Sequence, residues 1–293
     1  MTPASTVARV APDDFRWTAP TGAAADLRRV VDAATDEDGP APLDEAALLR
    51  LRHRGLVGTA LWVAGSDGFA WRHDGALDLV VAPASRGQGL GSALAAAAVP
   101  TTGDLSAWSH GNHPAAAALA ARFGLRRVRD LWVMRRSLSA LPPLPSSPLD
   151  VRPFRVGVDE DAFLAVNAAA FSHHPEQGGM TRADLDDRIA EDWFDPSGFF
   201  LAWDGDDLAG FHWTKEHPSY GEVYVVGISP SAQGAGLGKL LTLTGLHHLA
   251  ARGLDAVILY VESDNAPAVA VYERLGFSHA ERDTHVMYAR TAG

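Results

Sequence analysis

The sequence predicts an α/β protein of two tandem domains, each built on a mixed sheet flanked by helices. The first observation is a repeated glycine turn, because "APASRGQGLGSAL" at 82–94 and "SPSAQGAGLGKLL" at 229–241 align 147 residues apart. The second is "SLSALPPLPSSPL" at 137–149, whose prolines and serines are typical of a linker. Strand-like and helix-like runs follow the same order on both sides of this linker, which indicates an internal duplication. We therefore expect domains at 1–136 and 150–293.

The C-terminal half gives the clearest order of elements. Apolar aromatic runs at 198–203 and 208–215, joined by "DGDD", predict a β-hairpin. The near-continuous β-branched run at 256–263 predicts a strand that is buried on both faces. The other strands are expected at 151–155, 221–229 and 284–290, and the helices at 159–171, 181–192, 238–253 and 265–277. The N-terminal half repeats this plan, with strands expected at 59–65, 69–73, 77–83, 105–109 and 131–137.

Bulk properties limit the partners and the compartment. The net charge of −11 argues against a nucleic-acid-binding surface and suits a polar or cationic small molecule. The chain has no cysteine, which excludes disulfides, thiolate metal sites and a cysteine nucleophile. No apolar run is long enough for a membrane helix, and the first residues lack the pattern of a secretory signal. We expect a cytoplasmic monomer that contacts neither a membrane nor a nucleic acid.

The repeated turn predicts a binding site for a phosphate-bearing ligand. In both copies a strand leads through R/Q-x-x-G-x-G into a helix, whose first N–H groups and dipole attract an anion. A P-loop is excluded, because Gln233 and Leu240 stand where its first glycine and its Ser/Thr are required. The dinucleotide-binding fingerprint fits poorly, because this turn follows four predicted strands instead of the first one.

The second turn is part of a longer pattern that resembles one known family. After the turn and a buried strand comes N-x-x-A…Y-x-x-x-G-F, formed by Asn265, Ala268, Tyr272, Gly276 and Phe277. This pattern is similar to the GNAT family of acetyl-CoA-dependent N-acetyltransferases. The resemblance implies that each sheet is splayed open at its middle and that acetyl-CoA lies in the split as co-substrate.

The resemblance also assigns CoA contacts. Pantetheine would pair with the backbone of residues 226–228, the pyrophosphate would lie on the turn amides, and Asn265 would hold the CoA beyond the buried strand. The residues so assigned in the C-terminal copy are Val226, Gly227, Ile228, Gln233, Gly234, Ala235, Gly236, Leu237, Gly238, Lys239, Asn265, Ala266, Pro267, Ala268, Val269 and Ala270. In the N-terminal copy they are Val80, Val81, Ala82, Arg86, Gly87, Gln88, Gly89, Leu90 and Gly91.

Direct acetyl transfer needs a base for the amine, a donor for the oxyanion and an acid for the departing thiolate. Glu222 opens a strand, and counting by twos places it on one face with residues 224 and 226. A phenol such as Tyr272, with a pKa of about 10, can protonate a thiolate whose acid has a pKa of about 8.5. By residue type alone, Glu222 fits a solvated glutamate and Tyr272 a core aromatic. The family pattern assigns Glu222 as base, Tyr272 as acid and the N–H of Val226 as oxyanion donor.

Most of the C-terminal half is similar to one group of tandem GNAT enzymes. The similar segments are "FHWTK", "GEVYVVGISP", "GLGKLLTLTGLHHL" and "LYVESDNAPAVAVYERLGF". Enzymes of this group acetylate the cysteinyl amine of a pseudo-disaccharide, cysteinyl-glucosaminyl-inositol. The resemblance implies substrate contacts by Asp36, Glu176, Lys215, Glu222 and Tyr260, with Glu37 an alternative to Asp36 in "ATDEDG".

Two pairs of histidines do not form the pattern of a metal site. His247 and His248 are adjacent on a predicted helix, so their side chains point in different directions. His173 and His174 lack a matching frame of carboxylates or cysteines. We therefore expect no metal ion.

The first copy lacks both proton-transfer groups at the matching positions. The 147-residue offset takes Glu222 to Gly75, although Asp74 and Asp78 lie nearby and leave a carboxylate possible. The position of the tyrosine falls on Leu119 or on Ala120, depending on whether the alignment is anchored at residue 112 or at residue 124. We expect the N-terminal copy to bind CoA without turnover.

Two other functions are compatible with the sequence. The first is a tandem GNAT enzyme that acetylates another amine, such as an aminoglycoside or a peptide N-terminus. The second is an acetyl-CoA sensor without turnover, which the presence of both Glu222 and Tyr272 disfavours. A panel of amines, offered with acetyl-CoA, separates the three.

Overall fold

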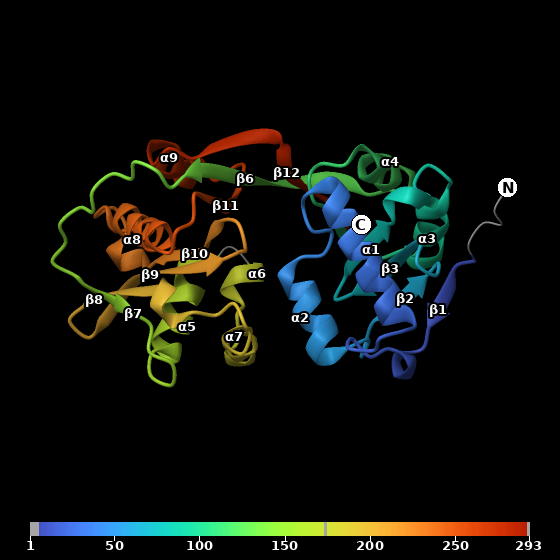
Figure 1. Ribbon diagram of the computed structural model, residues 1–293, viewed down its shortest axis with the longest axis horizontal. Helices are drawn as coiled ribbons and strands as arrows, with labels where there is room; N and C mark the ends of the chain where they lie inside the picture. Colours follow the sequence, from blue (N-terminus) through green and yellow to red (C-terminus); the bar gives the residue numbers. More distant parts are fainter. Residues whose placement is uncertain (1–5, 173–174, 292–293) are drawn as a thin grey trace. The chain divides into compact units, whose positions relative to one another are not determined.

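A computed structural model describes residues 6–172 and 175–291, and of Pro175 and Glu176 it describes the backbone alone. The chain forms two compact units (Figure 1). The N-terminal unit comprises Met1–Trp132, Glu262–Asp264 and Ala280–Gly293. The C-terminal unit comprises Val133–Val261 and Asn265–His279.

The elements of the N-terminal half follow the predicted order. Its strands are β1 (Ala8–Val10), β2 (Ala60–Val63), β3 (Gly68–His73), β4 (Ala76–Val81), β5 (Leu105–Ser109) and β6 (Arg126–Ser137). Its helices are α1 (Ala23–Asp38), α2 (Glu45–Arg54), α3 (Leu90–Ala98) and α4 (Pro114–Arg122), with short 3-10 turns at Pro12–Asp14 and Pro83–Ser85.

The elements of the C-terminal half repeat this order. Its strands are β7 (Asp150–Pro153), β8 (Phe199–Asp204), β9 (Asp207–Glu216), β10 (Gly221–Ile228), β11 (Ala256–Glu262) and β12 (Ser278–Arg290). Its helices are α5 (Glu160–Ala170), α6 (Pro175–Gly178), α7 (Arg182–Ile189), α8 (Leu237–Ala251) and α9 (Ala266–Arg274), with 3-10 turns at Pro196–Gly198 and Pro230–Ala232. The hairpin expected around "DGDD" is confirmed, because β8 and β9 pair antiparallel.

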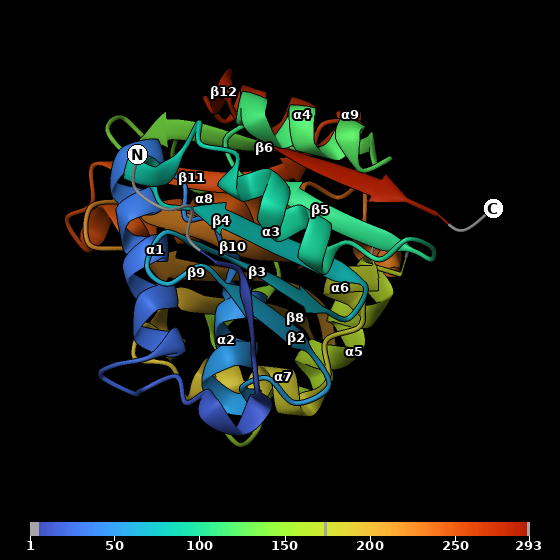
Figure 2. The ribbon, with the colours of Figure 1, turned by 90° about the vertical axis from the view of Figure 1, so that its right-hand side faces the viewer.

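The sheet of the N-terminal unit has helices on both faces. Its strand order is β1-β2-β3-β4-β5-β12-β6. Side chains alternate along β3, so Phe69 and Trp71 pack in a core with α1 and α2, whereas Ala70 packs in a core with α3 and α4. Figure 2 shows α3 lying over β3 and β4.

The sheet of the C-terminal unit is built in the same way, with the order β6-β11-β10-β9-β8-β7. Figure 1 shows α8 on one side of β9 and β10, and α5 and α7 on the other. The α5 side is an aromatic core that includes Phe163, Phe211 and Trp213, and the α8 side packs Leu237 and Leu241 against the sheet. A mixed sheet that is covered by helices in each unit confirms the predicted α/β class.

The two halves exchange their last strands. β12 begins at Ser278, but from Ala280 it belongs to the N-terminal unit, where Val286–Arg290 pair antiparallel with β5. β6 begins in the N-terminal unit, but from Val133 it belongs to the C-terminal unit, where it lies beside β11. Each unit is therefore completed by a strand from the other half of the chain.

The segment expected to be a linker has no regular structure, since residues 138–149 form neither helix nor strand. The domain boundaries on either side of it remain a proposal. Along residues 6–172 and 175–291, every helix is too short or too polar to cross a bilayer.

Candidate active site

Each sheet opens into a fork between two parallel strands. In the C-terminal unit, β10 pairs with β11 over Gly221–Val223, whereas its pairing with β9 continues to Ile228. In the N-terminal unit, β4 pairs with β5 at Ala76, whereas its pairing with β3 continues to Val81. Among the described residues, the rest of β4 and of β10 thus leaves one backbone edge without a strand partner. Such an edge can hydrogen-bond an extended ligand.

A glycine turn follows the first arm of each fork, with the same backbone in both copies. Gly236 (φ +79°) and Gly89 (φ +85°) are left-handed and stand immediately before α8 and α3. This conformation is natural to glycine and lets the first N–H groups of the helix face an anion. Gln233 and Lys239 are exposed, whereas Leu237 is buried in the core and has only its backbone to offer a ligand. The geometry suits the predicted pyrophosphate.

The carboxylate of Glu222 is buried at the closed end of the C-terminal fork. Glu222 is only 8% exposed, and its Oε2 lies 2.7 Å from Nε2 of His217. Its neighbour on β9 is Lys215, and its neighbour on β11 is Ile258. A solvated glutamate, which the residue type alone favoured, is not what the structure contains.

Tyr224 forms a β-bulge that the sequence did not predict. Val223 and Val225 pair with successive residues of β9, so Tyr224 is the extra residue. The bulge shifts the alternation of side chains by one position. Glu222 therefore shares a face with Val225, and the expectation from counting by twos that it shares one with Val226 is wrong. The backbone N–H of Val226 remains the proposed oxyanion donor.

Tyr272 lies on α9, the helix that follows the second arm of the fork. Burial raises the pKa of the Tyr272 hydroxyl to about 12. Its ring packs edge-on against Phe277, with 5.8 Å between the ring centroids. A phenol with this pKa retains its proton at neutral pH, as a general acid must.

Asn265 caps the same helix. Its Oδ1 accepts a hydrogen bond from the N–H of Ala268 at 3.2 Å, while the residue itself is exposed. The capping bond uses the amide oxygen, which is an acceptor, and does not use the NH₂ group, which can only donate. A CoA contact by Asn265 would therefore use its amide nitrogen as a donor.

A cluster of a cation and aromatic rings lies beside Glu222. Nζ of Lys215 is 4.1 Å from the ring centroid of Trp193 and 5.4 Å from that of Tyr224. Nε of Arg188 donates to the hydroxyl of Tyr224 at 2.9 Å. The sequence indicated Lys215 but not Trp193, Tyr224 or Arg188. These come from a loop, the bulge and α7, and only the fold brings them together.

The other predicted substrate contacts lie apart from this cluster along the chain. Tyr260 is on β11 and is 42% exposed. Asp36 is exposed on the last turn of α1, in the N-terminal unit. The side chain of Glu176, like His173 and His174, lies outside the described residues. These assignments remain predictions.

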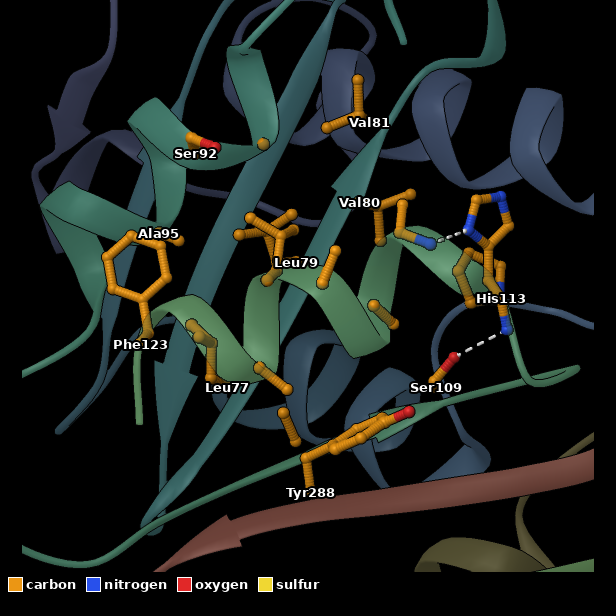
Figure 3. Close-up of a pocket in the computed structure, with 18 of the residues that line it drawn as sticks. Leu77, Leu79, Val80, Val81, Ser92, Ala95, Ser109, His113, Phe123 and Tyr288 are labelled. Atoms are coloured by element: carbon orange, nitrogen blue, oxygen red, sulfur yellow. Dashed lines mark hydrogen bonds between the residues drawn. The ribbon is translucent and has the colours of Figure 1, made fainter. Parts of the chain in front are cut away.

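A cavity of about 470 Å³ lies at the fork of the N-terminal unit (Figure 3). Its walls include Leu79 and Val81 of β4, Ala107 of β5, and Tyr288 of β12. It also reaches the residues of the first glycine turn. The cavity thus belongs to the copy without Glu222 and Tyr272, and its apolar walls lie beside the turn that is predicted to bind phosphate.

The hairpins identify the residue of the first copy that corresponds to Glu222. Counted from the end that leads into the glycine turn, the sixth pair is His73–Ala76 in β3–β4 and Lys215–Glu222 in β9–β10. The equivalent of Glu222 is therefore Ala76. The fixed offset pointed to Gly75 because the bulge adds one residue to β10.

Helix α4 identifies the equivalent of Tyr272. Helices α4 and α9 each have nine residues and are capped by the side chains of His113 and Asn265. Matched from these caps, Ala120 stands at the position of Tyr272, which selects it over Leu119. Alanine thus occupies both positions at which the second copy has a group that can transfer a proton.

The adjacent His247 and His248 have different partners. Nε2 of His247 is 2.8 Å from the carbonyl oxygen of Pro142. In the described part of the chain, ligand atoms of His248, Asp195 and Glu216 lie within 4.8 Å of one another. Arg252 donates to Glu216 at 2.8 Å, so a cation already holds that carboxylate. The absence of a metal from the reaction remains a prediction.

Comparisons with known proteins point to one family. Residues 167–277 match the model of the acetyltransferase (GNAT) family. Mycothiol acetyltransferase of Nocardioides sp. is 52% identical to this chain, over 92% of this chain and 97% of its own length. That of Catenulispora acidiphila is 50% identical, over 90% and 94%, and that of Actinosynnema mirum is 52% identical, over 91% and 95%.

Two solved structures share the fold over nearly the whole chain. A tandem GNAT protein from the clavulanic acid biosynthesis pathway has a TM-score of 0.68 at 20% identity, covering 98% of this chain and 99% of its own. A GNAT N-acetyltransferase from Sphaerobacter thermophilus has a TM-score of 0.65 at 23% identity, covering 97% and 95%. Both the family and the tandem fold expected from the sequence are confirmed. The chain is an acyltransferase of the GNAT type and belongs to the mycothiol acetyltransferase family.

Proposed function

We propose that this protein transfers the acetyl group of acetyl-CoA to the cysteinyl amine of cysteinyl-glucosaminyl-inositol, the last step of mycothiol formation. The observation that carries the proposal is the buried carboxylate of Glu222 at the start of a forked pair of strands, beside the cluster of Lys215, Trp193 and Tyr224. The names of the relatives support the choice of substrate. The protein acts in the cytoplasm as a monomer.

Acetyl-CoA supplies a thioester, and the chain supplies the proton transfers. Glu222 takes a proton from the substrate ammonium, directly or through one water, and the neutral amine attacks the thioester carbonyl. Because an α-amine has a pKa of about 7.7–8.0, the base has a modest task at neutral pH. The N–H of Val226 stabilises the oxyanion. The C–S bond then breaks, and Tyr272 gives its proton to the CoA thiolate. The attacking nitrogen passes its second proton through water to the Tyr272 phenolate, which leaves a neutral amide and restores the acid.

The acceptor side of the fork has the chemistry of a sugar-binding site. Lys215 is a cation held against the face of Trp193, and it donates to hydroxyl or ring oxygens of the substrate. Tyr260, Glu176 and Asp36 complete the set of substrate contacts. The aromatic rings provide apolar surface for the faces of the sugar and the inositol.

The first copy binds CoA without turning it over. Val80–Ala82 hold the pantetheine and Arg86–Gly91 the pyrophosphate, next to the cavity at this fork. Ala76 and Ala120 stand where Glu222 and Tyr272 stand in the second copy. Along the sequence, the proposed linker at 137–149 separates the first half, 1–136, from the half that carries the catalytic residues, 150–293.

Mass spectrometry of the acetylated product tests the proposal. The purified protein is incubated with acetyl-CoA and, in turn, cysteinyl-glucosaminyl-inositol, an aminoglycoside and a peptide. Reagents for free thiols are avoided, because this substrate itself carries a thiol. The proposal expects N-acetylation of the cysteinyl compound with the highest kcat/KM. Preference for another amine indicates a different acetyltransferase, and no product with any amine indicates a sensor.

A further inference from the structure

The turn between β9 and β10 places a histidine against the proposed base. We infer that His217 is a positioning residue, which holds the carboxylate of Glu222 in the orientation that receives the amine proton. The inference rests on the proposed function, since it concerns the base of that reaction.

The imidazole of His217 is fixed from two sides. The backbone N–H of His217 donates to the carbonyl of Tyr220 at 2.9 Å, which closes the turn between the strands. The ring stacks on that of Tyr220, with 4.4 Å between centroids and 21° between planes. Nε2 then lies 2.7 Å from Oε2 of Glu222. The turn therefore presents one ring nitrogen to the carboxylate in a constrained orientation.

The direction of this hydrogen bond follows from the chemistry of the base. A glutamate that is ready to accept a proton is ionised and has only lone pairs, so Nε2 of His217 must carry the hydrogen and donate it. A bond to a charged acceptor is stronger than a neutral one. It engages Oε2 and leaves Oε1 free to take the proton from the substrate. His217 thus holds a buried carboxylate in one orientation.

Other polar groups face the pair from the elements around it. Lys215 lies opposite Glu222 on β9, and Ile258 on β11 offers no charge. The pKa of the Tyr220 hydroxyl is raised, first by burial and then by the charge of Glu222, while Arg135 acts in the opposite direction. The direct hydrogen bond of 2.7 Å to the carboxylate comes from His217.

The first copy contains a similar pair at a position that the reaction does not use. Nε2 of His73 is 2.7 Å from Oδ2 of Asp78, and the ring of His73 stacks on Trp71 at 3.8 Å between centroids. Asp78, however, corresponds to Val225, because both stand in the fourth pair of their hairpins. This pair is a natural control for the loss of a histidine that stacks and bonds a carboxylate.

The test compares His217→Phe, His217→Gln and the control His73→Phe. Phenylalanine keeps the stacking and removes the donor, whereas glutamine keeps an N–H donor on a flexible chain. We expect His217→Phe to lower kcat roughly tenfold to a hundredfold, the worth of one hydrogen bond to a charged group, with the KM for acetyl-CoA unchanged. His217→Gln should recover much of the rate, because its amide N–H can still donate to the carboxylate.

The His73→Phe control should keep kcat within about twofold of the unmodified enzyme, since it perturbs a pair outside the reaction. A rate for His217→Phe equal to that of the unmodified enzyme, or a loss that His73→Phe reproduces, would overturn the inference. A crystal structure of His217→Phe gives a readout that needs no turnover. The Glu222 carboxylate should adopt another rotamer in this variant; an unchanged rotamer counts against the inference even if the protein acetylates no amine.

Discussion

Arg86 of the first glycine turn holds Asp38 at the end of α1 through two parallel hydrogen bonds of 2.8 and 2.6 Å. This bond to Arg86 keeps the pKa of the Asp38 carboxyl below its ordinary value, against the effect of burial. Asp38 is therefore ionised at neutral pH, at the wall of the cavity where a CoA phosphate would lie. The second turn has Gln233 in place of Arg86 and forms no such ion pair.

Asp38→Asn should strengthen CoA binding to the first copy. The substitution removes a negative charge from the phosphate site and frees Arg86 to bind the phosphate, which we expect to be worth roughly tenfold in affinity at low salt. Calorimetric titration with CoA, fitted with two sites, should show a change in one dissociation constant only. Asp32→Asn, an exposed residue of the same helix, is the control. Weaker binding would mean that Asp38 supports the turn instead of competing for Arg86.

Tyr272→Phe should lower kcat about a hundredfold, because a general acid typically contributes a factor of this size or more. CoA affinity should change little, since the hydroxyl acts on the thiolate and not on the bound thioester. Adding Ala120→Tyr should restore nothing, because the first copy also lacks the base. The measurement is the rate of product formation by mass spectrometry, together with a CoA titration. Full activity of Tyr272→Phe would show that another group protonates the thiolate.

The stability of the N-terminal unit should fall in mild acid. Burial lowers the pKa of His110 to about 4, and burial together with the neighbouring His110 lowers that of His285 to about 3. The two Nδ1 atoms are 3.0 Å apart. Both rings are neutral in the folded state, so the unfolded state takes up more protons below pH 6.5. The contribution of these two histidines to the free energy of unfolding is fully present above this pH. It decreases as the pH falls, by about 1 kcal/mol for each histidine at pH 5.5.

A double variant, His110→Phe with His285→Phe, checks this dependence. Two phenylalanines suit the edge-to-face packing of the present rings, which meet at 81°. Denaturant unfolding at pH 7.5 and pH 5.5 should show a smaller difference for the double variant, by about 2 kcal/mol. An equal difference in both proteins would assign the acid sensitivity to other groups.

A chain that ends at residue 279 should fail to fold its N-terminal unit, although the missing residues come from the opposite end of the sequence. Val286 is fully buried and Tyr288 is 7% exposed in the core around β3 and α3. Loss of such residues costs about 2–5 kcal/mol each, which is comparable with the whole stability of a domain. Limited proteolysis should cleave within residues 6–132, whereas a chain that ends at Arg290 should resist. Resistance of the shorter chain would show that the strand is dispensable.

The repeated turn and the alternating runs predicted most of the fold. The hydrophobic patterns were strong where strands are buried on both faces, as at 256–263, and the glycine turns appear with the expected backbone. The exchange of β6 and β12 could not be predicted, because a strand pattern shows that a segment pairs and does not show with which sheet. The local pattern of β12 would be the same whether the strand paired in the sheet of its own half or in that of the other half.

The site was predictable only where a residue belongs to a family pattern. Glu222, Lys215 and Tyr272 were indicated in this way, although by residue type alone Glu222 resembles a surface glutamate. His217 and Trp193 stand in a turn and a loop, where no periodicity marks them, and their contacts depend on the hairpin and the bulge. The bulge itself has no clear sequence signal, and it moved the equivalent of Glu222 in the first copy by one residue.

The exchange of last strands constrains how such a protein can evolve. Deletion of the first copy would also remove β5, the strand with which β12 pairs. The remaining half would then have a β12 without this partner. The copy with two alanines in place of the reacting groups therefore still supplies a strand without which the catalytic unit is incomplete.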